Sequence, residues 1–208
     1  MKYKAVFFDF DGTLMDTSEG IFAGGVYAME HVGLPPVPIT DRRRFIGPPL
    51  HDCFRILYGV QDKKTLDDLV REYRIYYHKE GRFLASFYPG IVEVLKTLKE
   101  RGYILAVATM KNEDLATEMC EHFDILKYFD HILGLNLAGT NSKADVLKLG
   151  FDLMKLKPED CVLVGDTEID SKGAQEAGCD CIKASWGFGY VPGDPETIDK
   201  PLDILRLV

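Results

Sequence analysis

The sequence has no long hydrophobic run, and this limits the classes of protein that it can encode. The first apolar stretch, in MKYKAVFFDFDG, is short and is interrupted by Asp9 and Asp11. A membrane-spanning helix needs about 20 consecutive apolar residues, and a secretory signal needs an uninterrupted apolar centre. We therefore expect neither a signal peptide nor a membrane span in this chain.

Paired cysteine motifs are lacking as well. The five cysteines are an odd number, and no two of them have the C-x-x-C spacing of a zinc or redox site. Cys161 and Cys181 lie in apolar runs, where a reduced cysteine packs as a small hydrophobic side chain. This usage indicates a reducing compartment, so we expect the protein to be cytoplasmic.

An excess of basic residues is also missing. The 208 residues include 25 Lys and Arg against 33 Asp and Glu, which gives a net charge of −8. Such a chain repels nucleic acid and anionic membranes, so we expect neither as a partner. A substrate that carries phosphate must then be attracted by a local cluster of cations or by a metal ion.

Short apolar runs predict a buried parallel sheet. Three runs are clear, at residues 4–9, 103–108 and 161–165, and two are weaker, at 179–183 and 131–135. Amphipathic helical patterns separate them, over residues 90–101 and 142–155. Strands that alternate with helices predict a three-layer α/β fold, Rossmann-like, with helices on both faces of the sheet.

Residues 16–84 have a different pattern, without a comparable strand run. Their apolar residues and turn signals predict several helices, at 17–32, 48–58 and 62–80. This block separates the first strand from the rest of the predicted sheet. We therefore expect a catalytic core of residues 1–15 and 85–208, with an inserted helical cap at 16–84.

Polar side chains follow three of the predicted strands. They are Asp9 and Asp11 at the end of the first, Thr109 and Lys111 at the end of the second, and Asp166 and Asp170 at the end of the third. The carboxyl ends of parallel strands share one edge of a sheet, where ligands bind. A cluster of carboxylates is costly without a bound cation, and oxygen ligands together with phosphate chemistry favour Mg²⁺.

These motifs resemble, in order and spacing, the phosphatase branch of the haloacid dehalogenase superfamily. Its first motif, D-x-D-G-T, is matched by residues 9–13, and its second, a Ser or Thr after a hydrophobic strand, by Thr109. Its third, a Lys or Arg, is matched best by Lys143, and its acidic G-D-x-x-x-D by residues 165–170. The helical insertion lies where this superfamily has its cap. The FIGPPL stretch at 45–50 is similar to phosphoglycolate phosphatase-like members.

The resemblance implies a role for each matched residue. Asp9 is the nucleophile that forms an aspartyl-phosphate, and Asp11 is the general acid and then the general base. Thr109 and Lys143 hold the transferring phosphoryl group. The Mg²⁺ ligands are Asp9, the backbone carbonyl of Asp11 and Asp166. Asp170 supports either the metal or Lys143.

Three further residues are candidates for substrate binding. Lys111 could bind the substrate or take the place of Lys143 as the phosphate cation, and the sequence leaves both open. Arg44 belongs to a basic run at 42–44 that could hold an anionic substrate, and Gly47 could bring the cap backbone close to it. The nearest substrates that the resemblance suggests are phosphoglycolate and a nucleoside monophosphate.

Two other functions remain open. A sugar phosphomutase has the same motifs and returns the phosphoryl group to its substrate. A phospho-acceptor signalling domain combines an acidic metal site with a phosphorylated Asp on a parallel α/β fold, without turnover of small esters. The position of D-x-D-G-T at the first strand argues against the second alternative, and Asp11 argues against a dehalogenase. We therefore expect an enzyme, a phosphatase for a small phosphorylated metabolite.

Overall fold

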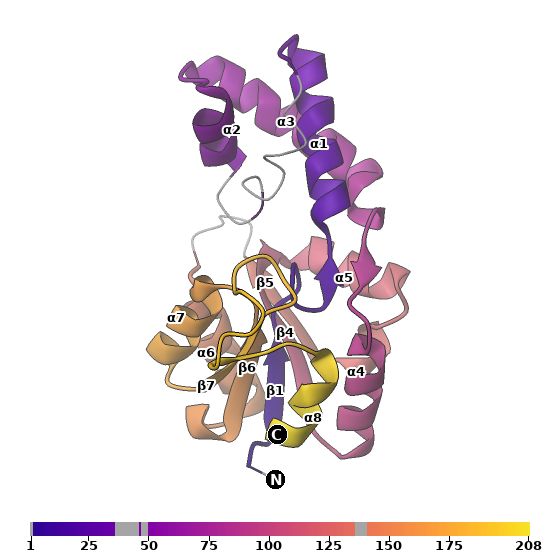
Figure 1. Ribbon diagram of the computed structural model, residues 1–208, viewed down its shortest axis with the longest axis vertical. Helices are drawn as coiled ribbons and strands as arrows, with labels where there is room; N and C mark the ends of the chain where they lie inside the picture. Colours follow the sequence, from indigo (N-terminus) through magenta and orange to yellow (C-terminus); the bar gives the residue numbers. More distant parts are fainter. Residues whose placement is uncertain (1, 36–45, 47–49, 136–140) are drawn as a thin grey trace. The chain divides into compact units, whose positions relative to one another are not determined.

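The computed structural model describes residues 2–35, 46, 50–135 and 141–208. Within it the chain forms two compact units. One unit consists of Met1–Asp16 with Phe87–Val208, and the other is Thr17–Ser86. Figure 1 shows the elements of both units.

A six-stranded parallel sheet forms the centre of the first unit. Its strand order is β5-β4-β1-β6-β7-β8. The strands are β1 (Ala5–Phe8), β4 (Ile104–Asn112), β5 (His131–Leu135), β6 (Cys161–Gly165), β7 (Asp180–Ala184) and β8 (Thr197–Ile198). Every residue of β1 and β6 is buried, because helices cover both faces of the central strands.

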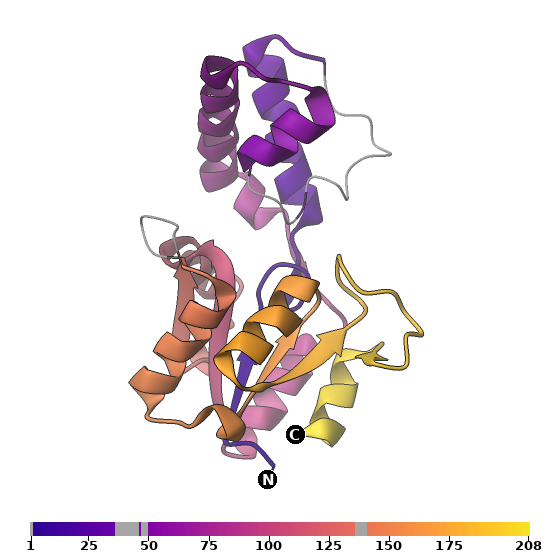
Figure 2. The ribbon, with the colours of Figure 1, turned by 90° about the vertical axis from the view of Figure 1, so that its left-hand side faces the viewer.

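Helices cover the two faces of this sheet, which makes three layers. Figures 1 and 2 show α6 (Lys143–Met154) and α7 (Glu168–Ala177) on one face. On the other face are α4 (Ile91–Glu100), α5 (Glu113–His122) and α8 (Ile204–Leu207). Short 3₁₀ turns connect the elements, at η3 (Leu126–Tyr128), η4 (Pro158–Asp160) and η5 (Pro201–Asp203). The predicted Rossmann-like α/β class is therefore confirmed.

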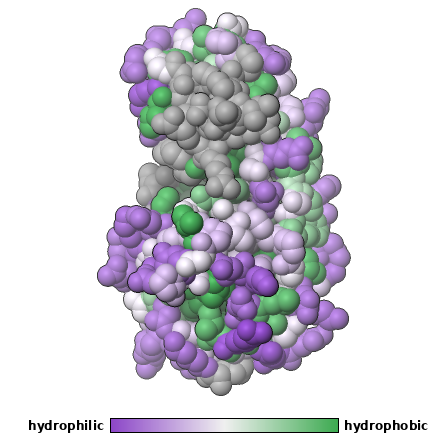
Figure 3. All heavy atoms as spheres, viewed as in Figure 1, coloured by the Kyte–Doolittle hydropathy of each residue, from purple (hydrophilic) through white to green (hydrophobic). Residues whose placement is uncertain are grey.

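The apolar side chains of the sheet lie between these layers. Under α6 and α7, Phe7 meets Phe151 edge to face with ring centroids 5.5 Å apart. The surface near α7 is largely hydrophilic in Figure 3, although a few apolar side chains such as Leu153 of α6 are exposed. Burial of the apolar faces is the main favourable contribution to folding, and it aligns the carboxyl ends of the strands at one edge.

The second unit is helical. It contains α1 (Ser18–Val32), α2 (Leu50–Tyr58), α3 (Lys63–Lys79) and the turn η2 (Gly81–Phe83). Helix α1 packs closely on α3. A Cβ atom added at Gly24 of α1 would lie only 2.8 Å from the ring of Tyr73 of α3, so glycine permits this close approach. A separate two-stranded sheet consists of β2 (Met15–Asp16) and β3 (Ser86–Phe87).

Most predicted elements exist, with shifted ends. The second predicted strand was too short, since β4 continues to Asn112 and includes Thr109 and Lys111. Helices α5, α7 and α8 and the two-residue strands β2, β3 and β8 were not predicted. Strand β8 lacks a local apolar run and is defined by its pairing with β7, which sequence alone does not show.

All five cysteines are free, as the sequence analysis expected of a reduced chain. In the described parts of the chain, no helix combines the length and the apolar character that crossing a bilayer requires.

Candidate active site

Asp9 lies directly beyond the carboxyl end of β1. Its backbone N–H donates to the carbonyl oxygen of Val164 at 2.9 Å, which continues the pairing of β1 with β6. The side chain is buried, with 8% of the residue exposed. The central position of β1 in the sheet therefore brings Asp9 beside the residues that follow β6.

Lys143 is the partner of Asp9. It is the first residue of α6, whose N-terminus is capped by Ser142 and Asp145. The Lys143 Nζ donates to Asp9 Oδ1 at 2.7 Å and to the carbonyl oxygen of Ala108 at 2.8 Å. Its aliphatic stem passes over Gly173 of α7, where a Cβ atom would lie 2.5 Å from Lys143 Cγ.

Asp170 contacts both Lys143 and the start of its own helix. Its Oδ1 lies 2.8 Å from Lys143 Nζ. Its Oδ2 accepts hydrogen bonds from the backbone N–H and the hydroxyl of Thr167, at 3.0 Å and 2.7 Å. The Asp170 carboxylate therefore connects the first turn of α7 to Lys143. Support of Lys143 is one of the two roles that the sequence analysis left open for Asp170.

Asp166 is the first residue after β6 and is fully buried. Its Oδ1 accepts a hydrogen bond from the hydroxyl of Thr13 at 3.0 Å. Its Oδ2 accepts one from the backbone N–H of Phe188 at 2.7 Å. Both carboxylate oxygens thus have a donor, and each retains a lone pair for a further ligand.

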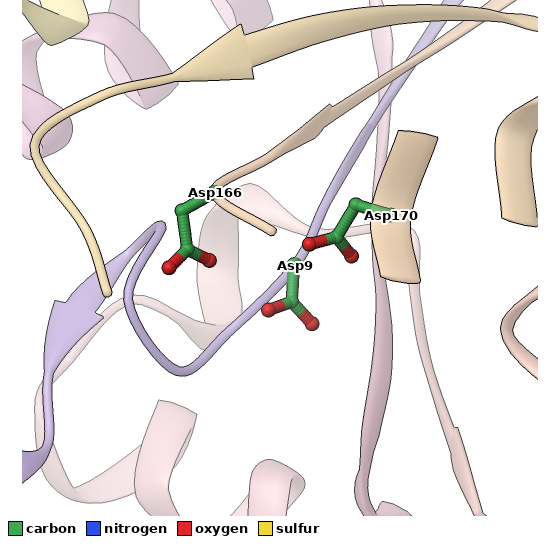
Figure 4. A group of neighbouring side chains, drawn as sticks. All are labelled: Asp9, Asp166 and Asp170. Carbon is green, nitrogen blue, oxygen red and sulfur yellow. The ribbon is translucent and has the colours of Figure 1, made fainter. Parts of the chain in front are cut away.

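The three carboxylates gather around one potential cation site. Figure 4 shows Asp9 beyond β1, Asp166 beyond β6 and Asp170 on α7. One oxygen from each lies within 4.8 Å of the others. Lys143 is the buried cation that contacts Asp9 and Asp170, so the three ionised acids would carry two more negative charges than this lysine balances. This set of hard oxygen donors fits a divalent cation such as Mg²⁺.

Burial also changes the protonation of these groups. Desolvation, with Asp170 and Asp166 nearby, raises the pKa of Asp9 to about 7, although Lys143 opposes the shift. Desolvation likewise raises the pKa of Asp166 to about 6, although the hydrogen bond from the backbone N–H of Phe188 opposes the shift. For Lys143, burial disfavours the charge, but Asp9 and Asp170 outweigh it and raise the pKa. Lys143 is therefore held as an ammonium group. The raised pKa values of the two carboxyl groups indicate that this single cation does not balance their negative charge.

The remaining predicted residues form a second group. Lys111 Nζ lies 3.0 Å and 3.1 Å from the two carboxylate oxygens of Asp11. The hydroxyl of Thr109, which is buried, accepts a hydrogen bond from the backbone N–H of Lys111 at 3.1 Å. The two candidate lysines thus face different aspartates, Lys143 facing Asp9 and Lys111 facing Asp11. Arg44 and Gly47 lie outside the described residues.

Sequence reasoning missed one element of this region. The sequence analysis assigned no role in the site to residues 186–190, yet the backbone N–H of Phe188 donates to the Asp166 carboxylate. The indole N–H of Trp186 also donates to the carbonyl oxygen of Thr13, at 3.1 Å. The glycines of this segment were the available signal, because close backbone approach to a side chain requires them.

The fold and these side chains together define a class of protein. A parallel α/β sheet carries a buried aspartate–lysine pair and further carboxylates at its carboxyl edge, the usual position of an active site in open α/β sheets. A family profile described as haloacid dehalogenase-like hydrolase matches residues 6–184. The chain belongs to this family, so it is an enzyme of the hydrolase class, and the resemblance seen in its motifs is confirmed.

Curated relatives of the chain carry different names. A 5'-nucleotidase of Pseudomonas aeruginosa is 34% identical over 190 residues, 91% of this chain and 86% of that protein. Tyrosine-protein kinase PtkA of Mycobacterium tuberculosis is 36% identical over 188 residues, 89% of this chain. The match spans 63% of PtkA, so this chain corresponds to a part of that protein.

Solved structures agree with the fold. A putative phosphatase of Clostridium difficile has a TM-score of 0.90 at 34% identity, covering 100% of this chain and 99% of that one. A putative phosphoglycolate phosphatase of Lactobacillus delbrueckii subsp. bulgaricus has a TM-score of 0.87, with 100% and 98% covered. Its identity is 24%, so this second likeness concerns the fold alone.

Proposed function

We propose that this chain is a Mg²⁺-dependent phosphatase that hydrolyses a small phosphate monoester through an aspartyl-phosphate on Asp9. The observation that carries the proposal is the buried pair of Asp9 and Lys143, 2.7 Å apart at the carboxyl edge of the sheet. A carboxylate next to a permanent cation can attack a phosphoryl group whose charge that cation neutralises.

The first half of the reaction transfers the phosphoryl group to Asp9. A carboxylate oxygen of Asp9 attacks the phosphorus, and the bond between phosphorus and the ester oxygen breaks. The carboxyl group of Asp11 gives its proton to that oxygen, so the product leaves as an alcohol. Lys143 and the hydroxyl of Thr109 hold the phosphoryl oxygens.

The second half releases phosphate. The carboxylate of Asp11 takes a proton from water, and the water oxygen attacks the phosphorus. The bond between phosphorus and Asp9 breaks, which restores the free carboxylate. Asp9, the backbone carbonyl of Asp11 and Asp166 would hold Mg²⁺, with Asp170 supporting Lys143. When bound, the ion would supply positive charge that offsets the negative charge of the phosphoryl group and of the Asp9 and Asp166 carboxylates.

The substrate proposal rests on the relatives. The name of the 34% identical 5'-nucleotidase supports a nucleoside monophosphate, and phosphoglycolate is the second candidate. We propose that the helical unit Thr17–Ser86 is a cap that selects among such substrates and that the enzyme acts in the cytoplasm.

The test is phosphate release from a panel of small phosphate monoesters, with Mg²⁺ and with a chelator. We expect release that requires Mg²⁺, with nucleoside monophosphates among the preferred substrates. Isomerisation of a hexose phosphate without phosphate release would favour a phosphomutase. A lasting acyl-phosphate on Asp9 without turnover would favour a phospho-acceptor domain, and turnover of phosphoproteins alone would exclude a small substrate.

We also propose that Lys111 binds the substrate. Replacing it by methionine should raise KM about tenfold or more, because a hydrogen bond to a charged group contributes about 1.5–3 kcal/mol. The kcat should fall less than KM rises. Steady-state kinetics on the preferred ester measure both. Lys99→Met is the matched control, since Lys99 pairs with both oxygens of Asp130 at 2.9 Å on the surface. An unchanged KM in Lys111→Met would contradict the assignment.

A further inference from the structure

The loop of residues 186–190, which follows β7, makes two backbone contacts with a single residue of the site. The N–H of Phe188 donates to Asp166 Oδ2 at 2.7 Å. The N–H of Tyr190 donates to the carbonyl oxygen of Asp166 at 3.0 Å. One short loop therefore holds both the side chain and the main chain of Asp166.

The orientation of the Asp166 carboxylate depends on two donors from distant parts of the chain. Thr13 binds Oδ1 at 3.0 Å, and Phe188 binds Oδ2 at 2.7 Å. Rotation of the carboxylate would break at least one of these bonds inside a buried site, where a lost hydrogen bond is costly. The lone pairs that remain on the two oxygens are thus held in a fixed direction.

Glycine is required where this loop meets Asp166. A Cβ atom on Gly187 would lie 2.3 Å from Asp166 Oδ2 and 2.3 Å from the carbonyl oxygen of Gly12. Gly12 has φ +90°, and a Cβ atom there would lie 2.2 Å from the same Asp166 oxygen. Any side chain at Gly187 would therefore push either the carboxylate or the backbone of residue 12 out of place.

The loop is itself anchored at both ends. Trp186 donates its indole N–H to the carbonyl oxygen of Thr13 at 3.1 Å. The hydroxyl of Tyr190 donates to the carbonyl oxygen of Thr167 at 2.8 Å. At the base, the N–H of Ser185 donates to the carbonyl oxygen of Ile198 in β8. These contacts tie the loop to the segments that precede β2 and α7.

We propose that the 186–190 loop is a positioning element that orients the Asp166 carboxylate for a divalent cation, with Gly187 as its critical residue. This inference rests on the proposed function, in which Asp166 is a metal ligand. Groups that orient a metal ligand typically contribute 10–100-fold to metal affinity. The loop contributes backbone donors, so its effect depends on close approach and not on the chemistry of its side chains.

The test measures Mn²⁺ binding to the full-length protein from the electron paramagnetic resonance signal of the free ion. We expect Gly187→Ala to weaken Mn²⁺ binding about 10–100-fold. Gly193→Ala is the matched control, because Gly193 has φ +88° and open space around it. Alanine at position 193 strains the backbone outside the 186–190 loop, and its Cβ atom contacts no neighbouring atom. The Mn²⁺ affinity of this variant should therefore stay within about twofold of the wild type.

A milder variant covers the case in which Gly187→Ala does not fold, as judged by circular dichroism. Trp186→Phe removes one N–H donor and keeps an aromatic ring, and we expect it to weaken Mn²⁺ binding several-fold. Wild-type affinity in the folded variants would overturn the positioning role alone. A wild-type protein that binds no Mn²⁺ at millimolar concentration would overturn the metal proposal and the positioning role with it.

Discussion

Asp9→Asn is expected to abolish phosphate release, with a fall in kcat on the order of 10⁴-fold or more. The amide has almost the same shape as the carboxylate but cannot act as the nucleophile. Its carbonyl oxygen can still accept the hydrogen bond from Lys143, which lies 2.7 Å from Asp9 Oδ1. Because burial already raises the pKa of Asp9 to about 7, a neutral side chain here should leave the protein folded.

Phosphate release and the unfolding midpoint would be measured on the same preparations. Asp152→Asn, at an exposed position of α6, is the control and should keep wild-type turnover. Turnover at the wild-type rate in Asp9→Asn would show that another group is the nucleophile.

Asp11→Asn separates proton transfer from metal binding. Only the backbone carbonyl of Asp11 is assigned to the ion, so the variant should lose turnover and retain most of its affinity for Mg²⁺. Asp166→Ala, which removes a carboxylate ligand, should lose affinity more strongly. Equal losses of affinity in the two variants, measured by metal titration, would contradict the assignment of only the backbone carbonyl of Asp11 to the ion.

The second large effect is expected from Lys143→Met. This change removes the buried ammonium group that pairs with both Asp9 and Asp170 and leaves these two carboxylates facing each other. Breaking a buried ion pair on one side typically costs about 3–5 kcal/mol, because a charge remains buried without its partner. Loss of the cation should also lower kcat by about 10³-fold or more. Urea unfolding and phosphate release measure the two effects.

A double variant separates the two roles of Lys143. Lys143→Met combined with Asp170→Asn removes one unpaired charge and should recover a large part of the lost stability, without recovering activity. Lys99→Met, which breaks a surface pair with Asp130, should cost less than about 1 kcal/mol. Full activity in the double variant would contradict a role of Lys143 in phosphoryl transfer.

The strands and the candidate residues were predictable for one reason. Asp9 and Asp166 directly follow fully buried strands, and Lys143 follows a capping serine at the start of a helix. Each of these signals is local in the sequence, so the pattern of a few neighbouring residues is sufficient. Parallel topology then requires the strand ends to meet at one edge of the sheet.

Other features could not be read from local patterns. Nothing near Thr109 shows that β4 continues to Asn112, because a strand's length depends on the partners with which it pairs. The two-residue β8 exists through its pairing with β7. Which lysine faces Asp9 was also open in the sequence, since Lys111 and Lys143 are both near strand or helix ends.

The amino-acid sequence by itself determined the fold class, the order of the motifs and the family. These depend on hydrophobic periodicity and on short runs of residues at strand ends. Only the tertiary structure decided that Gly173 makes room for Lys143 and that Gly187 lies against Asp166. Such contacts join segments far apart in the chain, and they arise because the packing of α7 and of the 186–190 loop leaves no space for a side chain at either glycine.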